Sequence, residues 1–394
     1  MRKLVGSVLF VVLLATLPLI SGCASAPTPT PAPTSKPAAP APKAEAATPK
    51  PAAATPAAPV TPKPETSASK PAAPAGPLAT VKVGTTQGAA SDAALYIAME
   101  KGYFEEEGIN VDLVNFTGIP QMTPPLSTGD LDVGGGIIGA ALFNAVERGI
   151  NLKLVADKSS VQTGKFMYGS VVVRKDLIDS GAVKEIKDLK GKKIGVSSLQ
   201  SGVEALVDFV LEKGGLSIKD VDLVTLSYPD AVVALSNKAI DAAWLIEPAQ
   251  TTAIDKGVAS LWAPGSVAQY TGGVAPGASM VYSAKFASNV DLARKFMVAY
   301  LRGVRDYIDA FAKGKNTDQV IAIMMKDTSL KDRAMYDKMR MTYTDPNGNV
   351  DVTSAQMVVD YMKKMGYYKG NLNAKDLIDP QFAEYAVQKL GQYK

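Results

Sequence analysis

The chain has 394 residues, no histidine and a single cysteine, Cys23. Without histidine there is no Ser-His-Asp triad, no histidine metal ligand and no histidine general base. A lone cysteine also excludes an internal disulfide framework and a zinc site built from several cysteines. We therefore expect a protein that is not an enzyme and that holds neither a metal nor a cofactor.

The part of the chain that can fold has no excess of positive charge. The formal net charge is +4, but Arg2 and Lys3 contribute two positive charges and residues 24–78 hold five Lys against two Glu. The remainder is therefore close to −1. A folded part without excess positive charge argues against a nucleic acid as partner.

The N-terminus has the pattern of a secretory signal peptide. A basic start is followed by an apolar run from Leu4 to Ile20, and then by Ser21, Gly22 and Cys23. This ending resembles a bacterial lipobox, which implies that residues 1–22 are removed and that Cys23 is lipidated. Lipid on one residue can hold a protein at a membrane surface without a spanning helix. We expect a lipid-anchored protein on the extracytoplasmic face of the cell membrane; an anchoring helix or a plain signal peptide are the alternatives.

Residues 23–78 have the composition of a linker. The stretch 24–78 contains 16 of the 26 prolines, 18 alanines and no aromatic residue. Such a segment cannot build a core and is expected to stay disordered, with semi-rigid polyproline II stretches. It predicts a spacer between the membrane and a folded part that begins near Ala79.

From Ala79 onwards, short β-branched runs alternate with longer helical patterns, which is typical of parallel sheets covered by helices. The pattern occurs twice. Residues 111–114 (Val-Asp-Leu-Val) match residues 221–224, and Leu131-Asp132 matches Ile240-Asp241. The sequence pattern that α/β folds have in common explains this match between the two blocks as well as an internal repeat does. Either explanation predicts two similar α/β lobes with a ligand cleft at the carboxyl ends of the strands.

Several segments in order resemble one family. They are residues 95–109 (LYIAMEKGYFEEEGI), 129–134 (GDLDVG), 172–176 (VVRKD), 189–196 (LKGKKIGV) and 240–248 (IDAAWLIEP). This set is similar to the binding proteins of bacterial ABC importers for nitrate, sulfonates, taurine, thiamine precursors and riboflavin. The resemblance implies a type II periplasmic-binding fold with two hinge crossings. It also implies a membrane permease as partner and a small-molecule ligand, and we expect a monomer.

The same resemblance sets the expected lobe boundaries. The first lobe is predicted to comprise residues 79–174 and 276–394, and the second residues 175–272. Residues 171–174 and 280–283 are predicted to be the crossing strands.

Loops and helix starts at the expected cleft provide the candidate ligand-binding residues. They combine backbone N–H groups, small residues, hydroxyls, aromatic rings and carboxylates. Each also has a structural explanation, such as helix capping, a tight turn or a place in the core. The candidates are Gln87, Ser91, Asp92, Gly136, Ile137, Tyr168, Ser198, Ser201, Tyr228, Trp244 and Glu247.

The candidate loops carry no Arg or Lys, whereas strongly anionic ligands usually gain from a bidentate Arg. Aromatic, amide, hydroxyl and acidic groups suit a neutral or weakly basic heterocycle. Among the ligands that the family handles, this favours riboflavin or a thiamine-type pyrimidine. The alternatives are taurine, an alkanesulfonate or nitrate as ligand, and a ligand-sensing lipoprotein that docks on a receptor.

Overall fold

The computed structural model describes residues 76–161, 166–262, 267, 270–328 and 330–394. These residues belong to one compact unit that contains two five-stranded sheets. The predicted signal peptide, Cys23 and almost all of the predicted linker lie outside the described residues. Within those residues, no helix is both long enough and apolar enough to cross a membrane.

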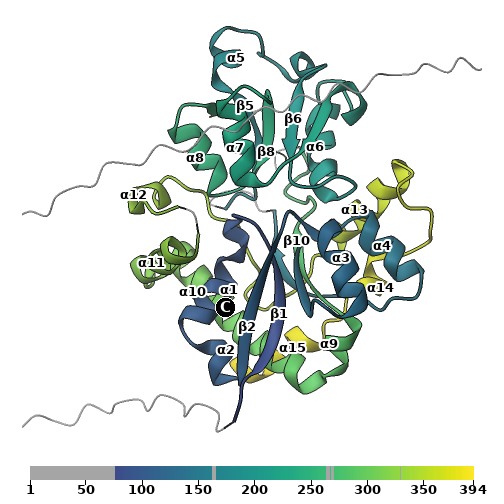
Figure 1. Cartoon of the computed structure of the whole chain (residues 1–394), viewed down its shortest axis with the longest axis vertical. Helices are drawn as coiled ribbons and strands as arrows, with labels where there is room; N and C mark the ends of the chain where they lie inside the picture. Colours follow the sequence, from purple (N-terminus) through teal and green to yellow (C-terminus); the bar gives the residue numbers. More distant parts are fainter. Residues whose placement is uncertain (1–75, 162–165, 263–266, 268–269, 329) are drawn as a thin grey trace, which may run out of the picture. The chain divides into compact units, whose positions relative to one another are not determined.

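The first sheet has the strand order β2-β1-β3-β10-β4, and Figure 1 labels its strands β2, β1 and β10. Strand β1 runs parallel to β2 and β3, whereas β10 runs antiparallel to both β3 and β4. Val81 and Val83 of β1 are fully buried, as expected for a strand covered on both faces. The strands are β1 (Ala79–Thr86), β2 (Ile109–Phe116), β3 (Val133–Ile137), β4 (Lys153–Ser159) and β10 (Ala278–Tyr282).

The second sheet has the order β7-β6-β8-β5-β9. Strand β6 is parallel to β7 and β8, and β5 is antiparallel to β8 and β9. Residues 170–174, which we assigned to the end of the first lobe, therefore pair within the second sheet. The rest of the lobe division stays a prediction. The strands are β5 (Ser170–Arg174), β6 (Lys193–Val196), β7 (Asp222–Thr225), β8 (Ala242–Leu245) and β9 (Ala259–Leu261).

Helices follow most strands, so the predicted alternation of strands and helices is confirmed. The helices near the first sheet in sequence are α1 (Ala93–Glu100), α2 (Tyr103–Glu106), α3 (Ile119–Thr128) and α4 (Ala140–Glu147). Those within the second sheet's segment are α5 (Lys175–Asp179), α6 (Gly202–Glu212), α7 (Tyr228–Ser236) and α8 (Ala249–Asp255). Short 3₁₀ turns occur at Ala90–Asp92, Ile186–Leu189 and Ile218–Asp220.

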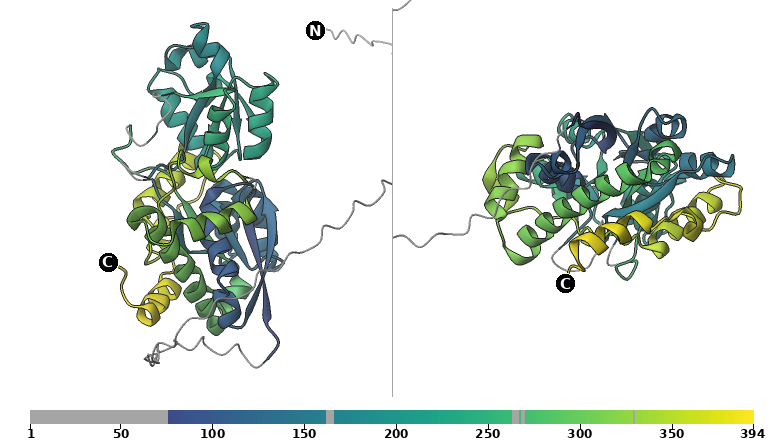
Figure 2. Two further views of the ribbon diagram at one scale, coloured as in Figure 1. Left: turned by 90° about the vertical axis from the view of Figure 1, so that its left-hand side faces the viewer. Right: turned by 90° about the horizontal axis from the view of Figure 1, so that it is seen from below.

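The C-terminal part is helical and packs on the first lobe, as the sequence predicts. Helix α10 begins where the Asn289 side chain accepts a hydrogen bond from Leu292 N–H, and ends at Gly314 in a left-handed conformation. It contacts α1 and α15, and Figure 2 shows the yellow C-terminal helix beside green helices. The C-terminal helices are α9 (Ala284–Ser288), α10 (Val290–Lys313), α11 (Thr317–Asp327), α12 (Arg333–Tyr336), α13 (Val352–Lys364), α14 (Ala374–Leu377) and α15 (Gln381–Leu390).

The two lobes are in direct backbone contact. Ala140 N–H donates to Gln200 O at 2.9 Å, and Gly202 N–H donates to Ile138 O at 3.0 Å. A Cβ atom added at Gly139 would lie only 2.4 Å from Gln200 O, so this approach requires glycine. The structure is therefore a closed form in which the loops after β3 and β6 meet.

Candidate ligand-binding cleft

The carboxyl ends of β1, β3 and β6 converge on a small cavity between the lobes. The space open to the centre of a water-sized sphere is about 10 Å³, which holds about one water molecule. The cavity is lined by Thr86, Ser91, Thr117, Gly118, Gly136, Ile137, Lys158, Tyr168, Ser197, Ser198, Val203, Tyr228, Ile246 and Ala278.

Six of the eleven predicted ligand-binding residues line this cavity. They come from both lobes, and they are Ser91, Gly136, Ile137, Tyr168, Ser198 and Tyr228. Contact with a ligand stays a prediction for all of them. The geometry brings them together at the edge where parallel strands of an α/β fold usually present their ligand.

A buried ion pair stands in the first-lobe wall of the cavity. Lys158 Nζ lies 3.0 Å from Asp92 Oδ1 and donates a hydrogen bond to Ser91 Oγ at 2.9 Å. The other carboxylate oxygen of Asp92 accepts from Thr86 N–H at 3.2 Å. Burial raises the pKa of Asp92, while the Lys158 ammonium and the Thr86 amide oppose that rise.

The expectation of a wall without cations is therefore wrong. The candidate loops carry no Lys or Arg, but Lys158 lies inside strand β4 and is 1% exposed. Its stem passes over Gly135, where an added Cβ would lie 2.7 Å from Lys158 Cε. The signal that could have found it is the glycine run Gly134-Gly135-Gly136, because glycines in one strand leave space for a long side chain from another strand.

Hydroxyl groups provide the polar part of the second-lobe wall, which also contains Val203 and Ile246. Ser197 Oγ donates to the Tyr228 hydroxyl at 3.3 Å, and Ser198 Oγ lies 2.8 Å from Ser201 Oγ. Ser201 also accepts from Val203 N–H at 3.2 Å and so begins helix α6. Burial raises the pKa of Tyr228 to about 12, so its phenol stays neutral and can both donate and accept hydrogen bonds.

Three predicted residues have structural roles next to the cavity. Asp92 is fully buried behind Ser91 as the partner of Lys158, and Ser201 caps α6. Trp244 is 1% exposed and belongs to the core of the second lobe.

The other two predicted residues also lie outside the cavity lining. Gln87 is exposed, and its N–H donates to Phe116 O. Glu247 accepts hydrogen bonds from Thr251 N–H and Oγ1 at 3.1 and 2.9 Å and from Arg340 N–H at 3.3 Å. Its carboxylate therefore holds the start of α8 against the C-terminal segment, and burial raises its pKa.

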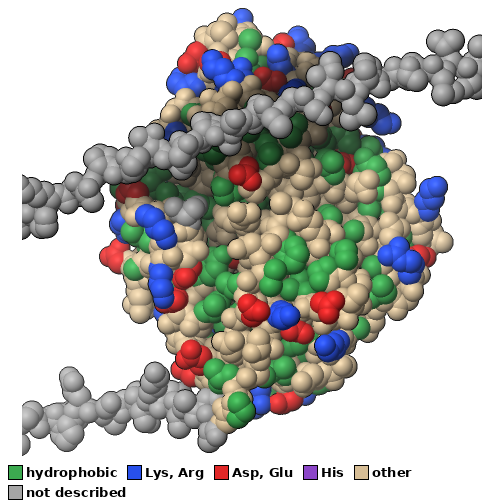
Figure 3. Space-filling view, viewed as in Figure 1, with side chains coloured by type: hydrophobic (Ala, Val, Ile, Leu, Met, Phe, Trp, Pro, Cys, Tyr) green, Lys and Arg blue, Asp and Glu red, His purple; other side chains and the backbone are tan. Residues whose placement is uncertain are grey.

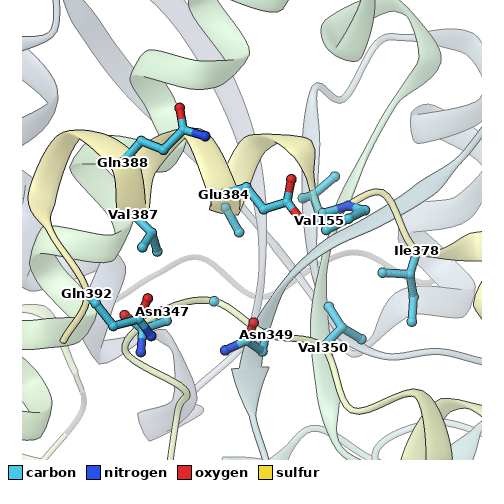
Figure 4. A pocket seen from close by; sticks show the side chains of 12 residues that line it. Val155, Asn347, Asn349, Val350, Ile378, Glu384, Val387, Gln388 and Gln392 are labelled. Atoms are coloured by element: carbon cyan, nitrogen blue, oxygen red, sulfur yellow. The ribbon is translucent and has the colours of Figure 1, made fainter. Parts of the chain in front are cut away.

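A larger pocket of about 390 Å³ lies in the first lobe (Figure 4). Amide side chains such as Asn347, Asn349 and Gln388 surround an apolar floor that includes Val155 and Val350. It is built by one lobe only, so closure of the two lobes cannot enclose a ligand there. Among the described residues, no group of three or more acidic side chains is placed to hold a metal ion. Lys, Arg, Asp and Glu are interspersed on the face drawn in Figure 3.

The sequence matches the NMT1/THI5-like family over residues 90–310, more than half of the chain. The chain belongs to the NMT1/THI5-like family. The family resemblance drawn from the sequence motifs is therefore confirmed.

Individual relatives cover less of the chain. A Brucella abortus protein described as a binding protein is 34% identical over 152 residues, which are 39% of this chain and 43% of the relative. A Haemophilus influenzae protein named for thiamine biosynthesis is 34% identical over 140 residues, 34% of this chain and 40% of that protein. The chain thus matches less than half the length of either relative.

Solved structures show the fold. The alkanesulfonate-binding protein of Xanthomonas axonopodis pv. citri, bound to MOPS, superposes with a TM-score of 0.60 at 20% identity. The match covers 78% of this chain and all of that protein. The two-lobed periplasmic-binding fold predicted from the sequence is confirmed.

Proposed function

We propose that this protein is the extracytoplasmic solute-binding lipoprotein of an ABC importer. It captures a small vitamin-like heterocycle, either riboflavin or a thiamine-type pyrimidine, and delivers it to a membrane permease. The observation that supports this most is the cavity at the strand ends, which takes polar side chains from both lobes. Family membership and the Brucella abortus relative described as a binding protein support this class of protein, and the relative named for thiamine biosynthesis supports a thiamine-type ligand.

The polar groups of the cavity favour a neutral ligand. Lys158 is the one charged side chain among the described lining residues, and Asp92 at 3.0 Å cancels its charge. An anion would lose its hydration and receive no net opposite charge in return. Hydroxyls of Ser197, Ser198 and Tyr228 can instead pair with ring nitrogens and carbonyls, and tyrosine rings offer stacking surfaces.

Binding requires the lobes to open, because a cavity for about one water molecule cannot hold a ring. The ligand enters the open form, contacts both walls and stabilises a form in which the lobes close around it and stand further apart than in this structure. The permease then receives the closed, ligand-loaded protein.

Anion binding is the second candidate, since Lys158 supplies an ammonium that the sequence did not place in the cleft. The likeness to an alkanesulfonate-binding protein agrees with this alternative. A ligand-sensing lipoprotein is a more remote candidate. We do not propose an enzyme, because general acid–base and nucleophilic chemistry by histidine is not available to a chain without histidine.

A thermal-shift screen of the full chain, purified in detergent, tests the proposal. The ligands are riboflavin, 4-amino-5-hydroxymethyl-2-methylpyrimidine, taurine, an alkanesulfonate, nitrate and bicarbonate. A specific ligand at 100 times its Kd adds about 2.7 kcal/mol to the free energy of unfolding. Stabilisation by riboflavin or the pyrimidine supports the proposed ligand class. Stabilisation by the anions alone contradicts it.

We also propose that Cys23 carries the lipid anchor. Replacing it in the variant Cys23→Ala is expected to release the processed protein from the membrane fraction, because no lipid can then be attached. Fractionation and mass spectrometry of the N-terminus measure this. A processed Cys23→Ala protein that remains in the membrane contradicts the proposed anchor.

A further inference from the structure

Lys158 combines deep burial with a position in the wall of the cleft. It is 1% exposed, it lines the interlobe cavity, and its charge is countered by a carboxylate that is itself fully buried. Burial of a Lys–Asp pair rarely improves stability over apolar residues of similar size, because both charges lose their hydration. A structural role alone therefore explains the pair poorly.

Neighbouring atoms fix the ammonium in one place. The stem is confined by Gly135, where no side chain larger than hydrogen fits, and by Met280, whose sulfur lies beside the same point. At its end, Nζ donates to Ser91 Oγ at 2.9 Å and lies 3.0 Å from Asp92 Oδ1. An ammonium group has three N–H donors, so at least one remains after these two contacts. No third partner occurs among the described residues.

We infer that Lys158 donates its remaining N–H to a hydrogen-bond acceptor of the bound ligand, and that Ser91 and Asp92 position the ammonium for this contact. The inference rests on the proposed function, in which a small ligand binds between the lobes. The ligand class is a small molecule with an exposed acceptor, such as a ring carbonyl or ring nitrogen. It meets Lys158 from the first lobe and hydroxyls from the second.

This arrangement links recognition to closure. Lys158 belongs to the first lobe, whereas Ser197, Ser198 and Tyr228 belong to the second. A ligand whose acceptor is held by the ammonium can reach those hydroxyls only when the lobes come together. A charge-assisted hydrogen bond inside a closed cleft is stronger than a neutral one, so its loss is measurable.

The test removes both charges together. Lys158→Met alone leaves Asp92 buried without a partner and is expected to impair folding. The double variant Lys158→Met with Asp92→Asn keeps similar side-chain volumes and leaves no unpaired charge. Lys153→Met is the matched control on the same strand, because Lys153 Nζ binds Asp376 O and does not line the cavity. Urea unfolding verifies that each full-length variant is folded.

Calorimetric titration then measures Kd for the six compounds of the thermal-shift screen. We expect at least a tenfold weaker Kd in the double variant and an unchanged Kd in Lys153→Met. If riboflavin or the pyrimidine binds the double variant as tightly as the wild type, the role of Lys158 is overturned and the proposed function stands. If only anions bind, and binding depends on Lys158, the proposed ligand class fails and the role of Lys158 stands. If none of the six binds the wild type, both fail.

Discussion

The two sheets have the same strand order and strand directions, but they differ at one position of the third strand, which is β3 in the first sheet and β8 in the second. Strands β2, β1, β3, β10 and β4 of the first sheet correspond in order and direction to β7, β6, β8, β5 and β9 of the second. In each sheet, the fourth strand in this order runs antiparallel to both neighbours. One framework has thus been used for two different walls of a cleft.

Two aspartates make the correspondence concrete. Asp132 N–H donates to Lys82 O at 3.1 Å, and its carboxylate accepts from Lys82 N–H at 2.9 Å. Asp241 makes the same pair of contacts with Lys193, at 2.8 and 3.0 Å. The matched Leu-Asp and Ile-Asp pairs in the sequence therefore occupy equivalent places beside the first strand of each lobe.

The two lobes differ a few residues after these aspartates, within strands β3 and β8. The strand registers make Gly135 of β3 equivalent to Trp244 of β8. In the first lobe, the glycine leaves space for the stem of Lys158, which carries a charge into the cleft. In the second lobe, Trp244 is fully buried and belongs to the apolar core. The same position thus leaves room for a cavity-lining side chain in one lobe and fills the core in the other.

The largest expected effect comes from removing the side chain of Trp244, which packs in the core of the second lobe. Trp244→Ala leaves a cavity in a well-packed core and is expected to lower the free energy of unfolding by about 3–5 kcal/mol. Urea unfolding measures this, and binding is measured below the transition. If Trp244→Ala leaves stability intact but abolishes ligand binding, then Trp244 belongs to the cleft and the contrast with Gly135 fails.

The next largest effect concerns a buried ionisable side chain on one of the two edge strands β4 and β9. Strand β4 carries buried Asp157, whereas β9 (Ala259–Leu261) has no ionisable side chain. Burial raises the pKa of Asp157 to about 7, although Asp345 N–H donates to its carboxylate at 2.7 Å. The folded protein therefore keeps a proton that the unfolded chain loses near pH 4, and stability falls as the pH rises from about 4 to 7.

Asp157→Asn removes this contribution. The variant is expected to gain stability relative to the wild type as the pH rises, by as much as about 4 kcal/mol at pH 8 compared with pH 4. Parallel urea titrations of both proteins at several pH values measure the difference. A difference that does not change with pH would show that Asp157 is already ionised at pH 4 in the folded protein.

The smallest effect tests the equivalence of the lobes. Asp132→Ala and Asp241→Ala each remove an acceptor for one backbone N–H, and each is expected to lower stability by about 1 kcal/mol. Asp241→Ala also removes an ion pair with Arg174 at 3.4 Å, so its loss is expected to be the larger of the two. Unfolding of the two variants under the same conditions gives the comparison. Losses that differ by more than about 1 kcal/mol would mean that the two contacts, similar in length, work in different surroundings.

The fold could be predicted from the sequence because its signals are local. Alternating strands and helices, small residues at helix starts and two similar sequence blocks are all visible without a structure. The sheet to which β5 belongs was harder to predict, because the sequence of a strand that crosses between the lobes does not indicate which sheet the strand joins. Residues 170–174 read equally well as the last strand of one lobe or as a strand of the next.

The cleft could be predicted only in part. Ser91, Ser198 and Tyr228 were found because they follow strands, where ligands of this fold bind. Lys158 was missed because its direction depends on a glycine in another strand, 23 residues earlier in the chain. Glu247 was misleading for a related reason, since a carboxylate after a strand serves equally well as a cap for the next helix.

The most direct test of the central claim asks whether the ligand binds between the lobes. Riboflavin and 4-amino-5-hydroxymethyl-2-methylpyrimidine are titrated into the wild type, Tyr228→Ala and Gln388→Ala. Tyr228 lines the interlobe cavity, and Gln388 lines the pocket of about 390 Å³ in the first lobe. We predict about tenfold weaker binding in Tyr228→Ala, through loss of ring contact, and wild-type binding in Gln388→Ala. Weaker binding in Gln388→Ala with no change in Tyr228→Ala would contradict the account.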